Sequence, residues 1–337
     1  MNYTPFVSII IPVRNEQNYL DACIRSILEQ DYPHEHMEVF FVDGQSTDST
    51  RCILAQYQNR FPPLFHILDN PHHTVPYAMN RGIRASKGEF IIRLDAHAEY
   101  AKDYISQCVR YLQQTDADNV GGAVITKSKG FMGGAIAQML SSPFGVGNSA
   151  FRTNGKDGYV DTVPFGAFRR EVFDKYGYYD ERLTRNQDNE MNYRIRKGGG
   201  KILMSHDIQL SYYCRNTLRG ILKMGVQNGK WNIITLFLCP GAMSLRHFVP
   251  FFFVFSLITL PLLGMICPLF WWLLSVEGCC YFLLDLFCSI RCAFKSRGGY
   301  FPLLLVLFPL FHISYGLGSF AGFLVLPKIL SKGRKST

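Results

Sequence analysis

Two apolar stretches near the C-terminus constrain this chain more than any other feature of its sequence. Between Phe248 and Ile290 only Glu277 and Asp285 are charged, and residues 298–327 contain no Asp, Glu, Lys or Arg. A helix needs about 20 apolar residues to cross the core of a bilayer. Both stretches are therefore predicted to span a membrane rather than to form a soluble core.

The first stretch is too long for a single tilted helix. We expect three spanning helices within residues 247–327, at 248–267, 269–290 and 301–326. A hairpin of the first two returns the next basic residues to the cytoplasm, as the positive-inside rule prefers, namely Arg291, Lys295 and Arg297. The third helix places the basic tail 328–337 outside, against that rule. Two long spans with a surface helix over 278–290 would reverse both placements.

The first 245 residues are expected to stay on the cytoplasmic side of the membrane. The apolar run Phe6–Val13 is too short for a signal peptide, and Arg14, Asn15 and Glu16 follow it directly. Basic and acidic residues nearly balance in this part, so its charge gives no support to nucleic-acid binding. We therefore expect a multi-pass protein of the cytoplasmic (inner) membrane whose N-terminal part faces the cytoplasm.

The N-terminal part alternates apolar strands with helices. Four runs are predicted strands: Val7–Val13, Val39–Val42, Phe65–Leu68 and Phe90–Leu94. Capping side chains and apolar residues at helical spacing occur between and after them. This alternation predicts an α/β domain over residues 1–215, with a mostly parallel sheet covered by helices on both faces.

Two further segments have a distinct composition. Residues 127–161 are rich in Gly, Ser and Asn, which predicts a mobile connection or lid. Residues 216–246 mix basic side chains with aliphatic ones and Trp231, which is typical of amphipathic helices at a membrane surface. Residues 162–170 could contribute to an acceptor site, although we prefer to interpret their phenylalanines as core.

Polar side chains stand where the predicted strands end. Arg14 and Asn15 follow the first strand, Asp43 ends the second and Asp95 follows the fourth. Ligands of parallel sheets bind beyond the carboxyl ends of the strands, so these residues form a candidate site. Asp43 can accept hydrogen bonds from a base or a ribose, because the residues after it are better helix caps.

Asp95 and His97 pair a carboxylate with an imidazole at a strand end. Such a pair could bind Mn²⁺ or Mg²⁺ that bridges two phosphates. A capping Asp followed by a surface His is the structural alternative, and the tripeptide alone does not decide between them.

Asp188 opens a predicted helix, where the helix dipole favours an ionised carboxylate. A general base must be ionised at neutral pH, which makes Asp188 the candidate base and Glu190 its competitor. Acidic residues that only complement the dipole are the alternative.

No GxGxxG motif follows the first strand and no GxxxxGK[ST] motif occurs, so dinucleotide-binding and P-loop sites lose their main support.

Five motifs follow one another along the chain: Pro12-Val13-Arg14-Asn15-Glu16, Val42-Asp43-Gly44-Gln45-Ser46-Thr47-Asp48, Asn80-Arg81-Gly82-Ile83 with Gly88-Glu89, Asp95-Ala96-His97-Ala98-Glu99-Tyr100 and Asn186-Gln187-Asp188. In this order they resemble the family 2 inverting glycosyltransferases of the GT-A fold. The resemblance is strongest to the exopolysaccharide branch, represented by the succinoglycan glucosyltransferases, and it extends into the apolar tail.

The resemblance implies a UDP-sugar donor and a metal ion, Mn²⁺ or Mg²⁺. The implied donor-binding residues are Pro12, Arg14, Asn15, Glu16, Asp43, Asn80 and Asp95. Asp95 and His97 occupy the DxD motif that holds the sugar nucleotide and its metal, and the acid matching Asp188 deprotonates the acceptor hydroxyl.

Two positions depart from the family pattern. His97 replaces the last acid of the DxD motif, which leaves the identity of the metal and the need for it open. Gln187 replaces the glutamate of the usual Glu-Asp pair. Gln227-Asn228-Gly229-Lys230-Trp231 is similar to the QxxRW motif of processive members, with Lys for Arg, although Trp231 could equally anchor the chain at the membrane interface.

The expected function is transfer of a sugar, with inversion, from a UDP-sugar to a polyprenyl-linked saccharide during synthesis of an exopolysaccharide or another cell-surface polysaccharide. Membrane lipid and other polysaccharide-assembly proteins are the expected partners. Three alternatives stay open: transfer to polyprenyl phosphate itself, a sugar-nucleotide-binding module without chemistry, and a carrier formed by the apolar tail.

Overall fold

The structure is a computed structural model, and it describes residues 3–147, 149, 151–153, 155–295 and 299–333 of the 337-residue chain. The chain divides into two compact units. The first unit comprises Met1–Ile125 and Asn154–Tyr213, and the second comprises Thr126–Thr153 and Cys214–Thr337. Residues 126–153 thus group with the C-terminal part, whereas the sequence suggests an uninterrupted domain over 1–215. Arg297 and residues 334–337 of the basic tail lie outside the described residues.

The first unit contains the strands and the helices between them. Its strands are β1 (Val7–Val13), β2 (Met37–Asp43), β3 (Phe65–Asp69), β4 (Phe90–Arg93), β5 (Ala98–Tyr100), β6 (Asn119–Lys127, which runs into the second unit), β7 (Gly158–Tyr159), β8 (Ala167–Arg169) and β9 (Ile202–Tyr213). Its helices are α1 (Leu20–Leu28), α2 (Thr50–Arg60), α3 (Val75–Ala85), α4 (Tyr104–Gln114), α7 (Glu171–Tyr176) and α8 (Gln187–Lys197), with a 3-10 turn at His34–His36.

These strands form one mixed sheet in the order β3-β2-β1-β4-β8-β6-β9-β5, and β7 pairs with β9. β1 is parallel to β2 and β4, so that Ile10 lies opposite Phe40 and Arg93, and β3 is parallel to β2. β8 is antiparallel to β4 and β6, and β9 is antiparallel to β5 and β7. The predicted α/β class is confirmed. The parallel pairs β1–β2, β1–β4 and β2–β3 lie among the first four strands, where helices between the strands supply the crossover connections that parallel neighbours need.

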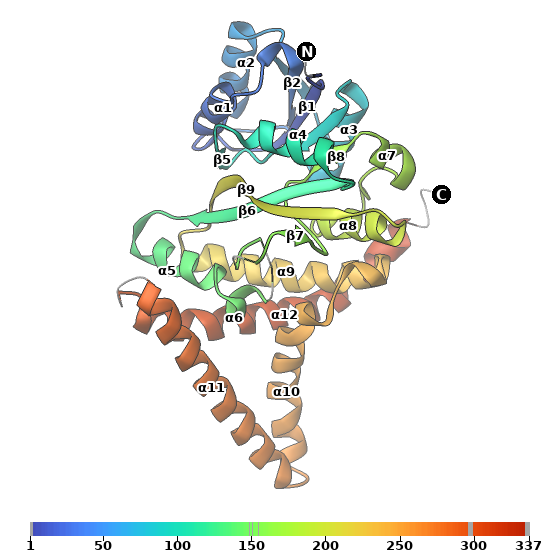
Figure 1. The fold of residues 1–337 in the computed structure, drawn as a ribbon. Helices are drawn as coiled ribbons and strands as arrows, with labels where there is room; N and C mark the ends of the chain where they lie inside the picture. Colours follow the sequence, from blue (N-terminus) through green and yellow to red (C-terminus); the bar gives the residue numbers. More distant parts are fainter. Residues whose placement is uncertain (1–2, 148, 150, 154, 296–298, 334–337) are drawn as a thin grey trace. The chain divides into compact units, whose positions relative to one another are not determined.

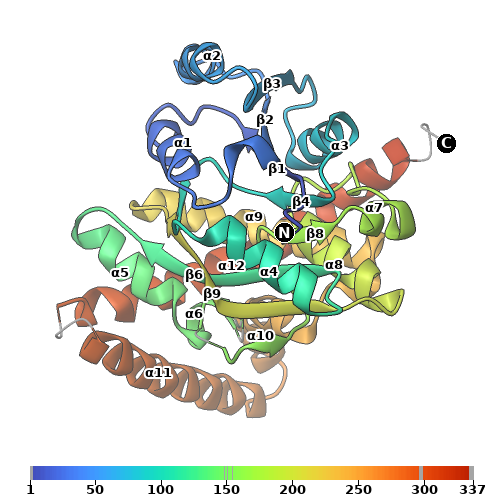
Figure 2. The same ribbon diagram turned by 45° about the horizontal axis from the view of Figure 1, so that its top comes forward.

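Helices cover both faces of the parallel strands. α1 and α2 lie on one face and α3 lies on the other (Figures 1 and 2). Right-handed crossovers explain this arrangement, since the chain moves from β1 through β2 to β3 and then returns across the sheet to β4. β1 and β2 are almost entirely buried, which accounts for their continuous apolar sequence. The carboxyl ends of β1, β2 and β4 share one edge of the sheet.

The second unit contains α5 (Gly130–Leu140), α6 (Pro143–Val146), α9 (Leu218–Leu238), α10 (Val249–Gly264), α11 (Leu269–Lys295) and α12 (Phe301–Gly333), with 3-10 turns at Pro240–Ala242 and Leu245–Phe248. In the described part of the chain, three helical segments are long and apolar enough to cross a membrane: Leu245–Gly264, Leu269–Phe294 and Phe301–Leu330. They agree with the three predicted spans. Figure 1 shows α10 and α11 as a hairpin whose helices diverge away from their connection.

Small residues bring α9 and α12 into close contact. Gly225 of α9 lies against Phe311 and Ser314 of α12, and Gly229 lies against Ser319. A side chain at either glycine would push the two helices apart. Close approach of backbones at small residues is a common way for helices to pack in membranes.

The segment predicted to be a mobile connection contains helix α5, so that prediction is wrong for residues 130–140. Ile136 and Met139 are fully buried in an apolar cluster that includes Phe308 of α12. Gly134 lies against the ring of Tyr300, where a side chain would not fit. The glycine therefore allows close packing in this helix rather than mobility.

Candidate active site

The loop after β1 is attached to the loop after β2. Asn15 has a left-handed backbone with φ of 57°, which Asn tolerates better than most residues. Its N–H donates to Ser46 Oγ at 2.9 Å, and its Oδ1 accepts from the Thr47 N–H at 2.8 Å. The Glu16 N–H donates to Thr50 Oγ1 at 2.8 Å. These bonds fix Asn15 and Glu16 at the edge of the sheet.

Asp43, the last residue of β2, is only 3% exposed. Its Oδ1 accepts hydrogen bonds from the Ser46 N–H at 3.1 Å and from the Ser46 hydroxyl at 2.6 Å. Arg51 donates to Asp43 Oδ2 at 3.2 Å and also ion-pairs with Asp69 at the end of β3. A base or a ribose, the ligands predicted for Asp43, would therefore bind beside these partners.

Pro12 and Arg14 lie at the same edge. Pro12 is half-buried in β1 opposite Val42, and Arg14 follows the strand with its side chain exposed. The Arg14 side chain runs along Gly44, where an added Cβ would come within 3.3 Å of Arg14 Cδ. Both predicted donor-binding residues are accessible beside the ends of β1 and β2.

Asn80 lies in α3 and is 2% exposed. Its Nδ2 donates to the Tyr179 carbonyl and to Glu181 Oε1, both at 2.9 Å, and its Oδ1 accepts from the Tyr179 N–H at 2.9 Å. These bonds attach α3 to the segment that leads into α8. Because both amide hydrogens have partners, Asn80 could contact a nucleotide only through the remaining lone pair of Oδ1.

Asp95 and His97 follow β4 and meet Glu16 from the loop after β1. His97 Nδ1 lies 3.2 Å from Glu16 Oε1 and 3.6 Å from Asp95 Oδ1. The opposite ring nitrogen, Nε2, lies 3.0 Å from the Tyr212 hydroxyl of β9. The side chains of His97, Glu16 and Asp95 are each about one-fifth exposed, so this acid–imidazole cluster of Glu16, Asp95 and His97 reaches the surface.

His97 balances the charge of the cluster. Burial alone would lower the pKa of His97, but the charge of Asp95 and the hydrogen bond to Glu16 outweigh it and raise the pKa well above its ordinary value of 6.5. The imidazole is therefore cationic at neutral pH between two carboxylates. A metal ion bound to His97 would replace this proton, because ligation requires the neutral ring.

The cluster fits a divalent cation that takes only part of its ligands from the protein. In the part of the chain that the structure describes, no group of three His, Cys, Asp or Glu side chains is arranged to hold a metal ion by itself. Mg²⁺ is usually bound by one or two carboxylates, with substrate phosphates and water as its other ligands. Asp95 and His97 would be sufficient for a metal ion that binds together with a nucleoside diphosphate.

Asp188, in the first turn of α8, ion-pairs with Arg93 at the end of β4. Arg93 is 4% exposed, and its guanidinium carbon lies 5.5 Å from the centre of the Phe165 ring. Arg93 Nε has no hydrogen-bond partner among the described residues. Sequence reasoning does not single out Arg93, although a charged residue in the otherwise apolar run Phe90–Leu94 is the signal that marks it.

The pKa of Asp188 is raised above its ordinary value of 3.8. Burial raises this pKa most, the ion pair with Arg93 lowers it, and the charge of Asp95 raises it again. A carboxylate with a raised pKa accepts a proton more readily than an ordinary Asp. The ion pair with Arg93, two residues before Asp95, places Asp188 near the end of β4, the strand that the acid–imidazole cluster follows.

Glu190, the competing candidate base, is engaged elsewhere. It is 4% exposed, and its two carboxylate oxygens accept from Arg194 Nε at 2.5 Å and Nη2 at 2.9 Å. The two residues lie one turn apart on α8. Glu190 therefore stabilises the helix, which leaves Asp188 as the accessible acid at its start.

Two aromatic residues connect Asp188 with the acid–imidazole cluster. The Phe165 ring contacts the Arg93 guanidinium and also stacks on the ring of Tyr212, with ring centroids 6.1 Å apart. Its left-handed backbone, with φ of 49°, is unusual for a bulky residue and is typical of functional sites. Phe165 is buried, as preferred from the sequence, but the residues that it packs against belong to the site.

The first half of the chain is similar to a known protein family. A family model described as glycosyl transferase family 2 matches residues 8–177. This range includes β1 to β8 and the residues of the acid–imidazole cluster, and it ends before Asp188.

Two curated proteins are similar over larger parts of the chain. The first is the dolichyl N-acetyl-alpha-D-glucosaminyl phosphate 3-beta-D-2,3-diacetamido-2,3-dideoxy-beta-D-glucuronosyltransferase of Methanococcus voltae. It is 28% identical over 324 residues, which cover 94% of this chain and 97% of that protein. The second is the succinoglycan biosynthesis protein ExoA of Rhizobium meliloti (strain 1021). It is 32% identical over 212 residues, which cover 62% of this chain and 64% of that protein.

Solved structures share the fold at low sequence identity. The mannosyltransferase PcManGT from Pyrobaculum calidifontis, in complex with GDP-Man and Mn²⁺, matches with a TM-score of 0.57 and 17% identity over 95% of this chain and 88% of that one. S. aureus TarS 1–349 in complex with UDP-GlcNAc matches with a TM-score of 0.52 and 16% identity over 93% and 90%. These likenesses confirm the predicted GT-A fold and show the fold alone.

Proposed function

Since the chain belongs to glycosyltransferase family 2, we propose that it transfers a hexose unit from a UDP-sugar to a lipid-linked saccharide, with inversion at the anomeric carbon. One observation carries this proposal. Asp188, a partly exposed carboxylate, ion-pairs with Arg93 at the end of β4, two residues before Asp95 of the acid–imidazole cluster. A base and a diphosphate-binding group at one edge are what glycosyl transfer requires.

In the proposed reaction Asp188 removes the proton from an acceptor hydroxyl. The oxygen of that hydroxyl forms a bond to the anomeric carbon while the bond from this carbon to the diphosphate oxygen breaks. Attack from the face opposite the leaving group converts an α-linked donor into a β-linked product. The ion pair with Arg93 orients the carboxylate. A nucleoside diphosphate departs without the proton that a glycosidase must supply from a second acid.

The donor would lie along the ends of β1, β2 and β4. We assign the uracil and ribose to the edge formed by Pro12, Arg14, Asn15 and Asp43, and the diphosphate to Asp95 and His97. Mn²⁺ or Mg²⁺ bound there would neutralise the charge that develops on the leaving group. Asn80 contributes by holding the segment that positions α8, through its bonds to Tyr179 and Glu181.

The acceptor is proposed to be anchored in the membrane. Three candidate spans support this, because they keep the enzyme at a bilayer. The name of the Methanococcus voltae relative, whose alignment covers nearly its whole length, specifies a dolichyl phosphate-linked sugar as acceptor. We propose a saccharide on a polyprenyl phosphate carrier, with the catalytic domain on the cytoplasmic side of the cytoplasmic membrane.

The test is a transfer assay on membranes that contain the protein. Labelled UDP-sugars are offered singly, with extracted lipid-linked saccharides or with polyprenyl phosphate as acceptor, with and without Mn²⁺. The proposal predicts label in the lipid-linked saccharide fraction with one UDP-sugar, and a β linkage in the product. Label on polyprenyl phosphate alone would identify the protein as a transferase that attaches the sugar to polyprenyl phosphate itself. No transfer to either acceptor from any UDP-sugar would contradict the proposal.

A further inference from the structure

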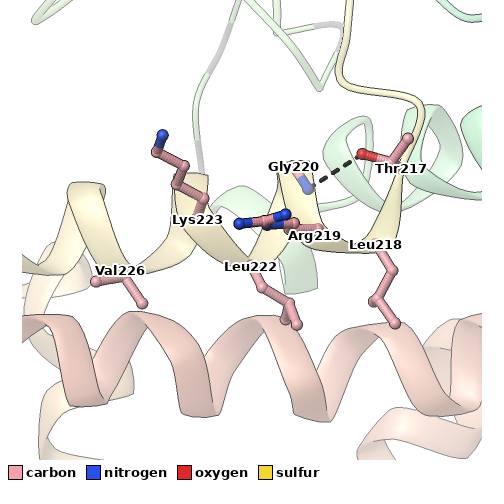
Figure 3. A pocket seen from close by; sticks show the side chains of 7 residues that line it. All are labelled: Thr217, Leu218, Arg219, Gly220, Leu222, Lys223 and Val226. Atoms are coloured by element: carbon pink, nitrogen blue, oxygen red, sulfur yellow. Dashed lines mark hydrogen bonds between the residues drawn. The ribbon is translucent and has the colours of Figure 1, made fainter.

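A groove of about 770 Å³ lies along the first turns of α9, lined by residues between 217 and 226. It lies entirely within the second unit. Figure 3 shows its lining side chains on two sides of the helix, with aliphatic groups on one side and the Lys223 ammonium on the other. The reaction proposed above uses none of these residues.

The aliphatic side of the groove is formed by Leu218, Leu222 and Val226. Each follows the previous one by four residues, so the three side chains lie in a row on one face of the helix. The backbone of Val226 packs directly against Gly318 of α12, a candidate membrane span. Leu218, at the other end of the row, is 37% exposed. The row is therefore an apolar path that begins at an exposed leucine and ends against a membrane-spanning helix.

The opposite side of the groove is cationic. Arg219 and Lys223 are one turn apart on α9, and both are exposed. In the part of the chain that the structure describes, no Asp or Glu oxygen lies within 4.0 Å of either side chain. The sequence explains this, since residues 208–276 contain no Asp or Glu. Two neighbouring cations without an acidic partner beside an apolar row complement a ligand with an anionic head and an aliphatic tail.

The helix itself adds to the positive potential. α9 begins at Leu218, and Thr217 caps it by accepting a hydrogen bond from the Gly220 N–H at 3.2 Å. The partial positive charge at the N-terminus of a long helix favours a phosphate group. Arg219 and Lys223 lie in the first two turns, where this charge acts with theirs.

We propose that this groove binds the phosphate of the polyprenyl carrier and the first units of its chain. The proposal rests on the proposed function and names a site for the acceptor's lipid. The phosphate pairs with Arg219 and Lys223, and the chain follows Leu218, Leu222 and Val226 toward α12. The groove holds only the lipid part of the acceptor, so the attached saccharide stays outside it.

The test measures binding rather than transfer, so that it does not depend on the reaction. Full-length protein in nanodiscs of phosphatidylcholine is titrated with fluorescent undecaprenyl phosphate, and with the matching polyprenol, which lacks the phosphate. Arg219→Gln/Lys223→Gln is expected to weaken binding of the phosphate at least tenfold, because each charged hydrogen bond contributes strongly, and to leave polyprenol binding unchanged. Arg60→Gln/Lys102→Gln removes one Arg and one Lys from exposed positions of the first unit, and serves as the control.

Three results would overturn the proposal: unchanged binding in the groove variant, an equal loss in the control variant, or equal competition by phosphatidylglycerol, which would make a bilayer phospholipid the occupant. Asp188→Asn is predicted to bind the carrier normally. If carrier binding depends on Arg219 and Lys223 while no sugar is transferred, the groove assignment stands and the proposed function fails. If transfer occurs but the groove variant binds the carrier normally, the proposed function stands and the groove assignment fails.

Discussion

The buried guanidinium of Arg93 ion-pairs with the carboxylate of Asp188 and so joins the end of β4 to the start of α8. The two residues are 95 positions apart in the sequence. Arg93 opposes the effect of burial on the pKa of Asp188, which is nevertheless raised. Arg93 therefore opposes protonation of the proposed base without needing to touch the substrate.

Replacing Arg93 is expected to change the pH dependence of transfer. Arg93→Met removes the charge that lowers the pKa of Asp188, so that this pKa rises further and the base is ionised only at higher pH. The acidic limb of the pH profile of kcat/KM should move upward by about 1–3 units, the usual effect of a neighbouring opposite charge. Arg25→Met, which breaks an exposed pair with Asp21, should leave the profile in place. If the acidic limb does not move in Arg93→Met, Arg93 does not influence the pKa of the catalytic base.

His97 is expected to support donor binding through a metal ion. His97→Ala removes one of the two predicted protein ligands, so Mn²⁺-dependent binding of UDP should weaken by about tenfold or more. Isothermal titration of UDP at several Mn²⁺ concentrations measures the effect, with the exposed His34→Ala as control. An identical Mn²⁺ titration in the wild type and His97→Ala would show that His97 is not a ligand.

Asn80 is expected to act mainly through stability. Asn80→Ala leaves the buried N–H and carbonyl of Tyr179 without partners, which should lower the free energy of unfolding by about 3 kcal/mol. The exposed Asn59→Ala is the control, and thermal denaturation followed by circular dichroism compares their Tm values. An unchanged Tm combined with weaker UDP binding would instead assign Asn80 to the nucleotide.

If all three candidate spans cross the membrane, the C-terminus is expected on the side opposite the N-terminal unit. A C-terminal epitope tag should therefore resist protease in sealed inverted vesicles, whose cytoplasmic face points outward. The tag should become sensitive only after detergent is added. Digestion of the tag in sealed vesicles would favour two spans with a surface helix.

The sequence predicts those parts of the site that follow from strand ends. Asp43 and Asp95 lie at the same edge of the sheet, because the carboxyl ends of the parallel strands β2 and β4 share that edge. Long-range pairings do not follow from such a rule, since neither the Arg93–Asp188 ion pair nor the His97–Tyr212 hydrogen bond leaves a local pattern. These contacts depend on where β9 lies in the sheet and on how α8 packs beside the end of β4.

A high glycine content predicts mobility wrongly where glycine instead allows two elements to pack closely. The glycines of residues 127–161 suggest mobility, yet Gly134 allows α5 to approach Tyr300. The three long apolar helices, in contrast, are predicted well, because apolar runs of about 20 residues with almost no charge are typical of membrane-spanning helices. The left-handed backbone of Phe165 has no sequence signal, because bulky residues rarely adopt it.

The role of Asp188 as the base is tested by measuring donor binding and transfer together in Asp188→Asn. The substitution keeps the shape of the side chain and removes its ability to accept a proton. The wild type and the variant are compared for UDP binding in the presence of Mn²⁺ and for the rate of sugar transfer to the lipid-linked acceptor. We predict unchanged UDP binding and transfer slower by about 10²–10⁴-fold, the usual contribution of a general base. Transfer at close to the wild-type rate would contradict this role.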